Sequence, residues 1–287
     1  MKFFRKHPVL FLLLLAILVL LLWTLWGNTA LTVTEYTIQN SKIPSAFDGF
    51  RIAQVSDLHN AQFGADNEKL LALLADTKPD MIAITGDLLD SRQTDMEIAI
   101  CFVQECAKIA PTYYVPGNHE ARIPSAYTSL KNEMDAVGIR VLENESIALE
   151  RKGSSIALTG LMDPDFGTTW PYVSGDSYQI LLSHRPELFD WYVRYGFDLV
   201  LTGHAHGGQF RLPFIGGLFA PHQGFLPKYT SGVHTQGETS MVVSRGLGNS
   251  AFPLRFNNRP ELIVITLQAA CFYELCKLQI MPPSVRN

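Results

Sequence analysis

The sequence predicts an α/β fold that follows one N-terminal transmembrane helix. Along residues 50–268, short apolar runs typical of buried strands alternate with segments of helical periodicity. Strands that are joined by a helix favour parallel pairing, because a parallel partner requires a long return connection. One long apolar segment precedes this region. The chain is thus divided into a membrane anchor over residues 1–30, a linker with the first structural residues over 31–49, a folded domain over 50–268 and a C-terminal tail over 269–287.

The composition indicates a single globular body of acidic character. The chain has 287 residues and 47% hydrophobic content, which is enough to bury one large core. The formal net charge is −4, and three of the basic residues, Lys2, Arg5 and Lys6, precede the apolar segment. The rest of the chain is therefore more acidic than the whole, which argues against a nucleic-acid-binding body.

The apolar segment from Val9 to Trp26 contains no charged residue and would form about 27 Å of helix, close to the thickness of a bilayer core. The alternatives are a cleaved signal peptide and a buried core helix. The sequence around Asn28 is a poor cleavage site, which favours an uncleaved anchor. Basic residues precede the segment and none follows it before Lys42, so we expect a single-pass protein of the cell membrane with a cytoplasmic N-terminus and an extracytoplasmic body.

The first strand of the body is expected over residues 50–55, and it delivers Asp57 and His59 two positions apart. Residues at this spacing share a face of an extended chain, so one cation can bind both. A helix from Asp66 to Thr77 follows, and the next apolar run, Met81 to Thr85, ends at Gly86-Asp87. Ligands of open α/β sheets gather at the carboxyl ends of strands, which makes Asp87 a candidate ligand, although a helix cap is the alternative.

Three further apolar runs also end in residues that bind metals. The strand over 112–115 leads into Asn118 and His119, where a Pro-Gly turn with a capping asparagine is the alternative. The strand over 178–182 ends at His184. The strand over 197–202 enters a glycine-flanked His204-Ala205-His206 loop. Two imidazoles in such a loop favour a metal site over a structural role, and coincidence at five strand ends is improbable.

The other expected elements are structural. They are helices over 94–109, 124–137 and 185–195, and strands over 139–142, 146–151, 155–158, 240–244 and 261–267. The four cysteines form two pairs with a spacing of five, Cys101 with Cys106 and Cys271 with Cys276, and this spacing on a helix favours buried free thiols over a local disulfide. A long-range disulfide remains an alternative.

The strand-end residues resemble a known motif series. The sequence is similar to the calcineurin-like metallophosphoesterases in the order of five motifs, which are Asp57-x-His59, Gly86-Asp87, Gly117-Asn118-His119-Glu120, His184 and Gly203-His204-x-His206. The extended string from Gly203 to Gln209, together with the apolar N-terminal segment, resembles a membrane-anchored bacterial branch of this superfamily. That branch includes proteins resembling the UDP-2,3-diacylglucosamine hydrolases of lipid A synthesis.

This resemblance implies a four-layer α/β/β/α sandwich that carries two divalent metal ions. One ion would bind Asp57, His59, Asp87 and His206, and the other would bind Asp87, Asn118, His184 and His204. Mixed nitrogen and oxygen ligands suit Mn, Fe, Zn or Co better than Ca or Mg. His119 is left over from the ligand set, and by resemblance it protonates the leaving oxygen or stabilises developing charge. Arg185, Asn249 and Arg255 are candidates for contacts with the substrate, with a structural role as the alternative for each.

The expected activity is hydrolysis of a phosphodiester or pyrophosphate bond by a metal-activated water, with a lipid-linked phosphate as one candidate substrate. The alternative is a catalytically silent metal-binding envelope protein that keeps the fold, against which the intact His119 argues. A tether would raise the effective concentration of a lipid-borne substrate. Six apolar residues after His206 are candidates to receive acyl chains, with a core hairpin as the alternative: Phe210, Leu212, Phe214, Ile215, Leu218 and Phe219.

Overall fold

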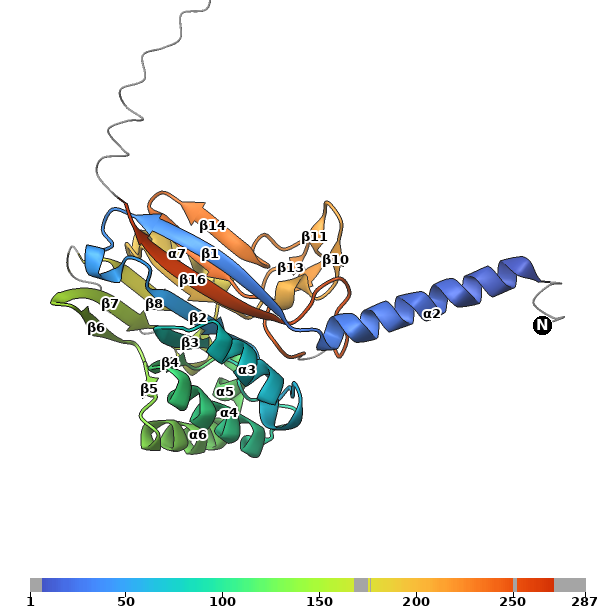
Figure 1. Cartoon of the computed structure of the whole chain (residues 1–287), viewed down its shortest axis with the longest axis horizontal. Helices are drawn as coiled ribbons and strands as arrows, with labels where there is room; N and C mark the ends of the chain where they lie inside the picture. Colours follow the sequence, from blue (N-terminus) through green and yellow to red (C-terminus); the bar gives the residue numbers. More distant parts are fainter. Residues whose placement is uncertain (1–6, 168–174, 176, 250–251, 271–287) are drawn as a thin grey trace, which may run out of the picture.

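Two mixed six-stranded sheets form the body of the protein (Figure 1). The computed structural model describes residues 7–167, 175, 177–249 and 252–270. The strand order of the first sheet is β1-β16-β2-β3-β4-β5, and that of the second is β14-β15-β9-β8-β7-β6. Ile52, Ala83, Ile180 and Leu201 belong to one buried cluster that includes side chains of both sheets. The expected α/β fold with a central core is therefore confirmed.

The first sheet is covered by helices on its outer face. Its strands are β1 (Thr32–Asn40), β2 (Arg51–Val55), β3 (Met81–Thr85), β4 (Thr112–Val115), β5 (Arg140–Val141) and β16 (Glu261–Ala269). The helices are α3 (Glu68–Asp76), α4 (Met96–Ile109), α5 (Asn118–Arg122) and α6 (Pro124–Ala136). Because side chains alternate along a strand, Ala53 and Val55 of β2 face the helix side of the sheet, whereas Ile52 faces the second sheet. Strands β2, β3 and β4 are parallel, as the helical connections predict.

The second sheet carries the remaining site-bearing strands. It consists of β6 (Glu145–Arg151), β7 (Ser154–Gly160), β8 (Gln179–Leu182), β9 (Leu199–Thr202), β14 (Gly232–Gln236) and β15 (Thr239–Val243). Helix α7 (Phe189–Arg194) packs on its outer face through Phe189 and Tyr192, which contact Leu181 and Val200 in a separate buried cluster. Short 3₁₀ helices occupy Ser45–Phe47, Ala65–Asn67, Pro164–Phe166, Pro186–Leu188 and His206–Gly208.

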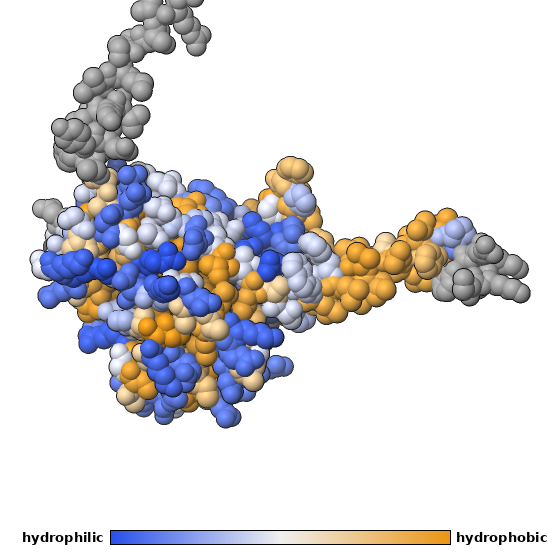
Figure 2. Space-filling view, viewed as in Figure 1, coloured by the Kyte–Doolittle hydropathy of each residue, from blue (hydrophilic) through white to orange (hydrophobic). Residues whose placement is uncertain are grey.

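Helix α2 (Pro8–Thr29) projects away from the body (Figure 1). Among the described residues it is the one helix long and apolar enough to cross a membrane, and its most apolar stretch is not buried against the body. Figure 2 shows its apolar surface exposed along its length. An N-terminal apolar helix of this kind is compatible with an anchor or a signal sequence.

The linker expected over residues 31–49 is wrong for most of its length. Strand β1 begins at Thr32, only two residues after α2 ends, and pairs in parallel with β16 from Thr32 opposite Glu261 to Asn40 opposite Ala269. The polar character of the segment suggested a linker, but its threonines and Val33 favour strand. Because the partner strand lies near the other end of the chain, the pairing cannot be predicted from the local sequence.

Two short hairpins follow the His204-Ala205-His206 loop, and residues 209–226 that contain them are called the double hairpin. Strands β10 (Arg211–Leu212) and β11 (Gly216–Gly217) form the first, and β12 (Phe219–Ala220) and β13 (Gly224–Phe225) form the second. The alternative of a core hairpin is wrong, because Leu212, Phe214, Ile215 and Phe219 are exposed and the Phe214 side chain is fully exposed. Phe210 and Leu218 are half-buried.

Cys101 is half-buried and Cys106 is buried, and both are free thiols, as the spacing predicted. Burial raises the pKa of the Cys106 thiol well above its ordinary value, so this residue behaves as an apolar core side chain. Cys271, Cys276 and the rest of the C-terminal tail after Ala270 lie outside the described residues.

Candidate metal centre

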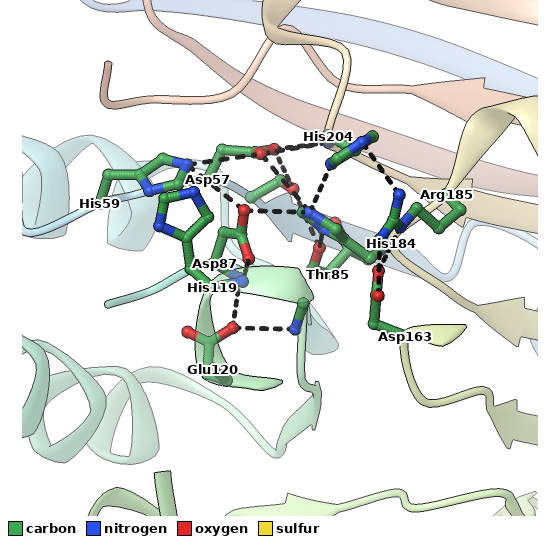
Figure 3. Close-up of polar contacts among 12 residues, drawn as sticks. Asp57, His59, Thr85, Asp87, His119, Glu120, Asp163, His184, Arg185 and His204 are labelled. Atoms are coloured by element: carbon green, nitrogen blue, oxygen red, sulfur yellow. Dashed lines mark hydrogen bonds and ion pairs between the residues drawn. The ribbon is translucent and has the colours of Figure 1, made fainter. Parts of the chain in front are cut away.

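The carboxyl ends of five strands meet at one edge of the body, where the sequence-predicted site residues come together. Strands β2, β3 and β4 of the first sheet and β8 and β9 of the second lead into them. Figure 3 shows the side chains from both sheets pointing toward one another. All eight residues are buried, with between 0% and 6% of their surface exposed, namely Asp57, His59, Asp87, Asn118, His119, His184, His204 and His206.

The side chains form two adjoining clusters. In the first, Asp57 Oδ1 lies 3.8 Å from His59 Nε2 and 3.5 Å from His206 Nε2. In the second, His184 Nε2 lies 3.1 Å from Asp87 Oδ2 and 3.1 Å from His204 Nδ1. In each cluster one ligand atom from every residue lies within 4.8 Å of the others. These are buried His/Asp clusters consistent with a dimetal site.

Asp87 lies between the two clusters. Its Oδ2 is 3.1 Å from His184 Nε2 in one cluster and 3.5 Å from His59 Nε2 in the other. Burial alone would raise the pKa of the Asp87 carboxyl, but the charges of His184 and His59 lower it well below its ordinary value. A carboxylate in this position can serve two cations at once.

The amide of Asn118 completes the second cluster. The end of its side chain lies 3.2 Å from His184 Nε2 and 2.9 Å from His204 Nδ1. Which amide atom occupies this end is an assignment from the surroundings, and an oxygen there would converge with two imidazole nitrogens on one point. The amide oxygen and the two imidazole nitrogens would then be three electron-pair donors that could bind one cation.

The donor set fits divalent metals. Both ring nitrogens of His59 are buried without a hydrogen-bond partner among the described residues, which is costly unless a cation binds one of them. His184 Nδ1 donates a hydrogen bond of 2.8 Å to the Thr85 carbonyl. The ring proton is therefore held at Nδ1, and Nε2 is left with the lone pair that a metal ligand requires.

The loops that carry these residues have unusual backbone conformations. Positive φ angles occur at five site residues, namely 53° at Asp57, 46° at His59, 54° at Asp87, 65° at His204 and 46° at His206. Left-handed conformations are uncommon for residues with a Cβ and persist where surrounding contacts enforce them. Two such contacts are the His204 N–H, which donates to Asp57 Oδ2 at 3.0 Å, and the His119 N–H, which donates to Asp87 Oδ1 at 2.9 Å.

Gly86 is required by close packing between the loops. Its φ is +85°, and an added Cβ would lie 2.7 Å from His184 Nδ1 and 2.8 Å from the backbone nitrogen of Gly117. Any side chain at this position would therefore separate the β3 loop from the β4 loop and from His184. This contact explains why the acid at the end of β3 follows a glycine.

Glu120 is a site residue whose role the sequence reasoning missed. Its Oε2 accepts hydrogen bonds from the Asp87 and Gly117 N–H groups, both at 2.9 Å, and its Oε1 accepts one from Leu89 at 3.0 Å. The carboxylate is fully buried. Burial and the charge of Asp87 raise the pKa of Glu120 to about 7, although the backbone donors act in the opposite direction. The one feature of the sequence that could have identified Glu120 as a site residue is its place in the Gly117-Asn118-His119-Glu120 motif.

We expect Glu120→Ala to lower metal affinity and turnover by about 10- to 100-fold, because the loop that positions Asp87 loses three hydrogen-bond acceptor contacts. Metal titration followed by steady-state kinetics measures both effects. Glu150→Ala, which removes an exposed carboxylate from β6, is the matched control and is expected to change neither. Wild-type metal affinity in Glu120→Ala would contradict the positioning role.

His119 lies beside the two clusters and stands apart from them in its hydrogen bonding. The Ser91 N–H donates to His119 Nδ1 at 3.0 Å, so a neutral ring carries its proton at Nε2. Asp90 Oδ1 is 3.6 Å from the same Nδ1. Burial lowers the pKa of His119 to about 4, with the His59 charge acting in the same direction and the Asp87 charge against it.

A pocket opens over the clusters and is lined in part by groups that attract anions. Its lining includes Asp87, His119, Arg92, Arg122 and His222. His222 was not predicted, and it comes from the turn of the second hairpin, where its Nδ1 lies 2.8 Å from His204 Nε2. No motif marked this residue, because the hairpin that carries it has no regular pattern.

The three other candidates for substrate contacts have structural partners. Arg185 is buried and ion-paired with Asp163. Arg255 is fully buried, and its Nη1 donates to the Arg245 carbonyl at 2.7 Å while its Nε donates to Asn249 Oδ1 at 2.8 Å. These contacts favour the structural alternative for Arg255. Arg185 also lies 2.6 Å from His222 Nδ1 through its Nη1, and Asn249 also lines a pocket with His59, so both have a structural partner and a place at the site.

Comparisons with known proteins agree with this geometry. Residues 50–208 match the family of calcineurin-like phosphoesterases. The chain is 35% identical over 249 residues to the uncharacterized metallophosphoesterase YkuE of Bacillus subtilis, covering 82% of this chain and 85% of the relative. It is 30% identical over 224 residues to the phosphodiesterase YaeI of Escherichia coli, and the match covers 76% of this chain and 82% of that relative. A Bos taurus transmembrane protein with a metallophosphoesterase domain is 27% identical over 266 residues, and the match covers 83% of this chain and 57% of that relative.

The family match spans more than half of the chain and includes all eight predicted site residues. The buried His/Asp clusters supply the metal-binding groups that a phosphoesterase of this family needs. The chain therefore belongs to the calcineurin-like phosphoesterases and is a metal-dependent phosphoesterase hydrolase.

Proposed function

We propose that this protein is a membrane-anchored dinuclear-metal phosphoesterase that hydrolyses a phosphodiester or pyrophosphate bond. The observation that carries the proposal is the meeting of two buried clusters at Asp87, with His119 beside them. Two bound divalent ions would supply a water that is nucleophilic at neutral pH and would neutralise phosphate charge. Mn, Fe, Zn or Co suits the mixed nitrogen and oxygen donors.

The ligand sets implied by the sequence are retained in this proposal. Asp57, His59, Asp87 and His206 would hold one ion, and Asp87, Asn118, His184 and His204 would hold the other. The distances within each cluster and the lone pair left at His184 Nε2 support this division. Asp87 would be shared, because its Oδ2 lies 3.5 Å from His59 Nε2 and 3.1 Å from His184 Nε2, one histidine of each cluster.

His119 would act on the leaving oxygen. The Ser91 N–H keeps Nδ1 as an acceptor, so the proton available to a substrate is the one at Nε2. Arg92 and Arg122 line the same pocket and would attract the phosphate charge. A catalytically silent metal-binding protein would require neither this proton donor nor the arginines, which is why hydrolysis is the favoured activity.

The relatives narrow the substrate class. The name of the YaeI relative makes a phosphodiester the first candidate, and that of the bovine relative supports a membrane-bound form. A lipid-linked phosphate combines both properties. UDP-diacylglucosamine is a lipid of the cytoplasmic face, whereas the charge bias around α2 places the body outside the cytoplasm. We therefore favour an extracytoplasmic lipid-borne diester over that nucleotide lipid.

The full chain in lipid nanodiscs, stripped of metal and reloaded with Mn, Fe, Zn or Co, tests the activity. We expect hydrolysis of bis(p-nitrophenyl) phosphate or of a pyrophosphate diester to appear on reloading, with about two ions bound per chain. Elemental analysis measures the number of bound ions, and release of product measures hydrolysis. Two bound ions without turnover of any phosphoester would favour the silent binding protein instead.

Orientation is tested by a reporter fused after Asn287. Basic residues ahead of α2 and the absence of any between α2 and Lys42 predict an extracytoplasmic body. We therefore expect a periplasm-active reporter, such as alkaline phosphatase, to be active and a cytoplasm-active reporter to be inactive. The reverse result would contradict the charge argument and make a lipid of the cytoplasmic leaflet the better substrate candidate.

A further inference from the structure

The base of α2 is fixed to the body and is not joined to it by a flexible tether. Asn28 Nδ2 donates to the Arg255 carbonyl at 2.9 Å, and the Arg255 N–H donates back to Asn28 Oδ1 at 2.8 Å. Arg259 Nε donates to the Ala30 carbonyl at 2.9 Å, and its guanidinium lies 4.8 Å from the centre of the Trp26 ring. Because β1 then starts at Thr32, the direction of the helix relative to the body is set by contacts.

An apolar loop connects this base to the double hairpin. The loop contains Phe252, Pro253 and Leu254, directly before Arg255. Toward the helix base, Asn249 Nδ2 donates to the Pro253 carbonyl at 3.0 Å and to Asn28 Oδ1 at 3.2 Å. On the other side, Gln209 Nε2 donates to the Phe252 carbonyl at 3.0 Å and to the Leu254 carbonyl at 2.6 Å. The helix base, the loop and the hairpins are therefore contiguous.

The exposed apolar side chains of the body are concentrated on these two segments. Among the described residues outside α2, the exposed large apolar side chains belong to residues 212–226 and 252–254. Trp191 and Val233 are the two exceptions. The exposed fraction is 109% for Phe214, 84% for Phe225 and 68% for Leu226. Figure 1 shows the hairpin strands at the end of the body from which α2 projects. An apolar surface of this kind marks an interaction site.

The metal centre opens next to the same segments. One pocket is lined by His59, Asp90 and Arg92 together with Asn249 and Pro253 of the loop region. The second hairpin reaches the clusters through His222, whereas its Phe225 is exposed to solvent. The second hairpin therefore combines a polar contact with the site and an exposed apolar residue, and the loop borders the pocket through Pro253.

We propose that the exposed apolar residues of 212–226 and 252–254, here called the docking face, rest on the bilayer that α2 spans. The occupant is the lipid surface, because the docking face is joined to the base of an apolar helix whose direction is fixed. A phosphate at headgroup depth would then reach His59 along the pocket beside Pro253, while its acyl chains stay in the bilayer. This inference rests on the proposed function for the membrane anchor and for the identity of the substrate, but docking does not depend on catalysis.

Two variants of the full chain in lipid nanodiscs test the proposal. The first inserts a flexible Gly-Ser segment of about twelve residues between Ala30 and Leu31, which keeps the tether but releases the body. The second is Phe214→Ser with Phe225→Ser. Trp191→Ser with Val233→Ser is the matched control, because it removes exposed apolar side chains that lie outside the docking face. Each is assayed with a bilayer-borne phosphodiester and with soluble bis(p-nitrophenyl) phosphate.

We expect the ratio of bilayer-borne to soluble turnover to fall about tenfold or more in both variants and to stay unchanged in the control. An unchanged ratio after the insertion would overturn the proposal, since tethering alone would then suffice. Hydrogen exchange supplies a readout that needs no substrate: backbone amides of 212–226 should be protected in nanodiscs and lose that protection on insertion. Equal exchange of these amides in the wild-type and insertion proteins would also overturn docking. Protection that persists without lipid would overturn it as well, because contacts within this protein would then account for the protection. If no phosphoester is hydrolysed at all, the proposed function fails while the exchange result still decides the docking.

Discussion

Asp87→Ala is expected to remove both metal ions and nearly all turnover. Asp87 Oδ2 lies within 3.5 Å of histidine nitrogens in both clusters, so the substitution would take one ligand from each of the two proposed ligand sets. It also removes the acceptor of the His119 N–H, which helps to hold the β3 and β4 loops together. Elemental analysis of the purified protein, combined with turnover of a soluble diester, measures the loss.

Two further variants separate ligation from folding. Asp87→Asn retains an oxygen that can accept the hydrogen bond from the His119 N–H but removes the charge, and it should also lose most bound metal. Asp135→Ala, which removes an exposed carboxylate from α6, should keep both ions and full turnover. Two ions bound to a folded Asp87→Ala protein would rule out the shared-ligand role.

His119→Ala is expected to keep both ions and to lose about 10²–10⁴ in turnover, the usual contribution of a positioned proton donor. The ring is outside the proposed ligand sets, and its Nδ1 is already engaged by the Ser91 N–H. The loss should be largest for diesters with poor leaving groups, which need a proton at the departing oxygen. Kinetics with alkyl and nitrophenyl diesters of one series measure this dependence.

The leaving-group series also separates proton donation from a structural role. A structural defect would lower turnover of every diester by a similar factor, whereas loss of the donor spares nitrophenolate. His234→Ala serves as the control, because this half-buried histidine of β14 is bonded to the Ser231 carbonyl, away from the clusters. Unchanged turnover of an alkyl diester in His119→Ala would contradict the assignment.

Much of the fold and of the candidate site could be predicted because the signals were local. Each site-bearing strand is a short apolar run that ends in a potential ligand, and the carboxyl ends of parallel strands share an edge. Asp57, Asp87 and His184 therefore came together as expected, although they belong to different strands and to both sheets. The helical connections also predicted the parallel order of β2, β3 and β4.

What could not be predicted depends on partners far away in the chain. The local sequence of β1 predicts a linker, because its partner, β16, lies more than two hundred residues later. The motif identifies Glu120 but not its role, because that role depends on N–H groups that only the folded loops bring together. The left-handed backbone at Asp57 and His204 suits residue types that adopt positive φ more often than most. The contact between them, in which the His204 N–H donates to Asp57 Oδ2, links positions far apart in the chain and could not be predicted from the sequence.

The pairing of β1 with β16 has a consequence for biosynthesis. Strand β1 leaves the ribosome directly after α2, whereas β16, which lies between β1 and β2 in the sheet, is made only after residue 260. A nascent chain that stops earlier carries a complete apolar helix but a first sheet without its connecting strand. Since non-local strand pairing is slow and waits for both partners, the helix is available to the membrane well before the domain can close. With α2 as the anchor proposed above, final assembly of the enzyme would take place at the membrane.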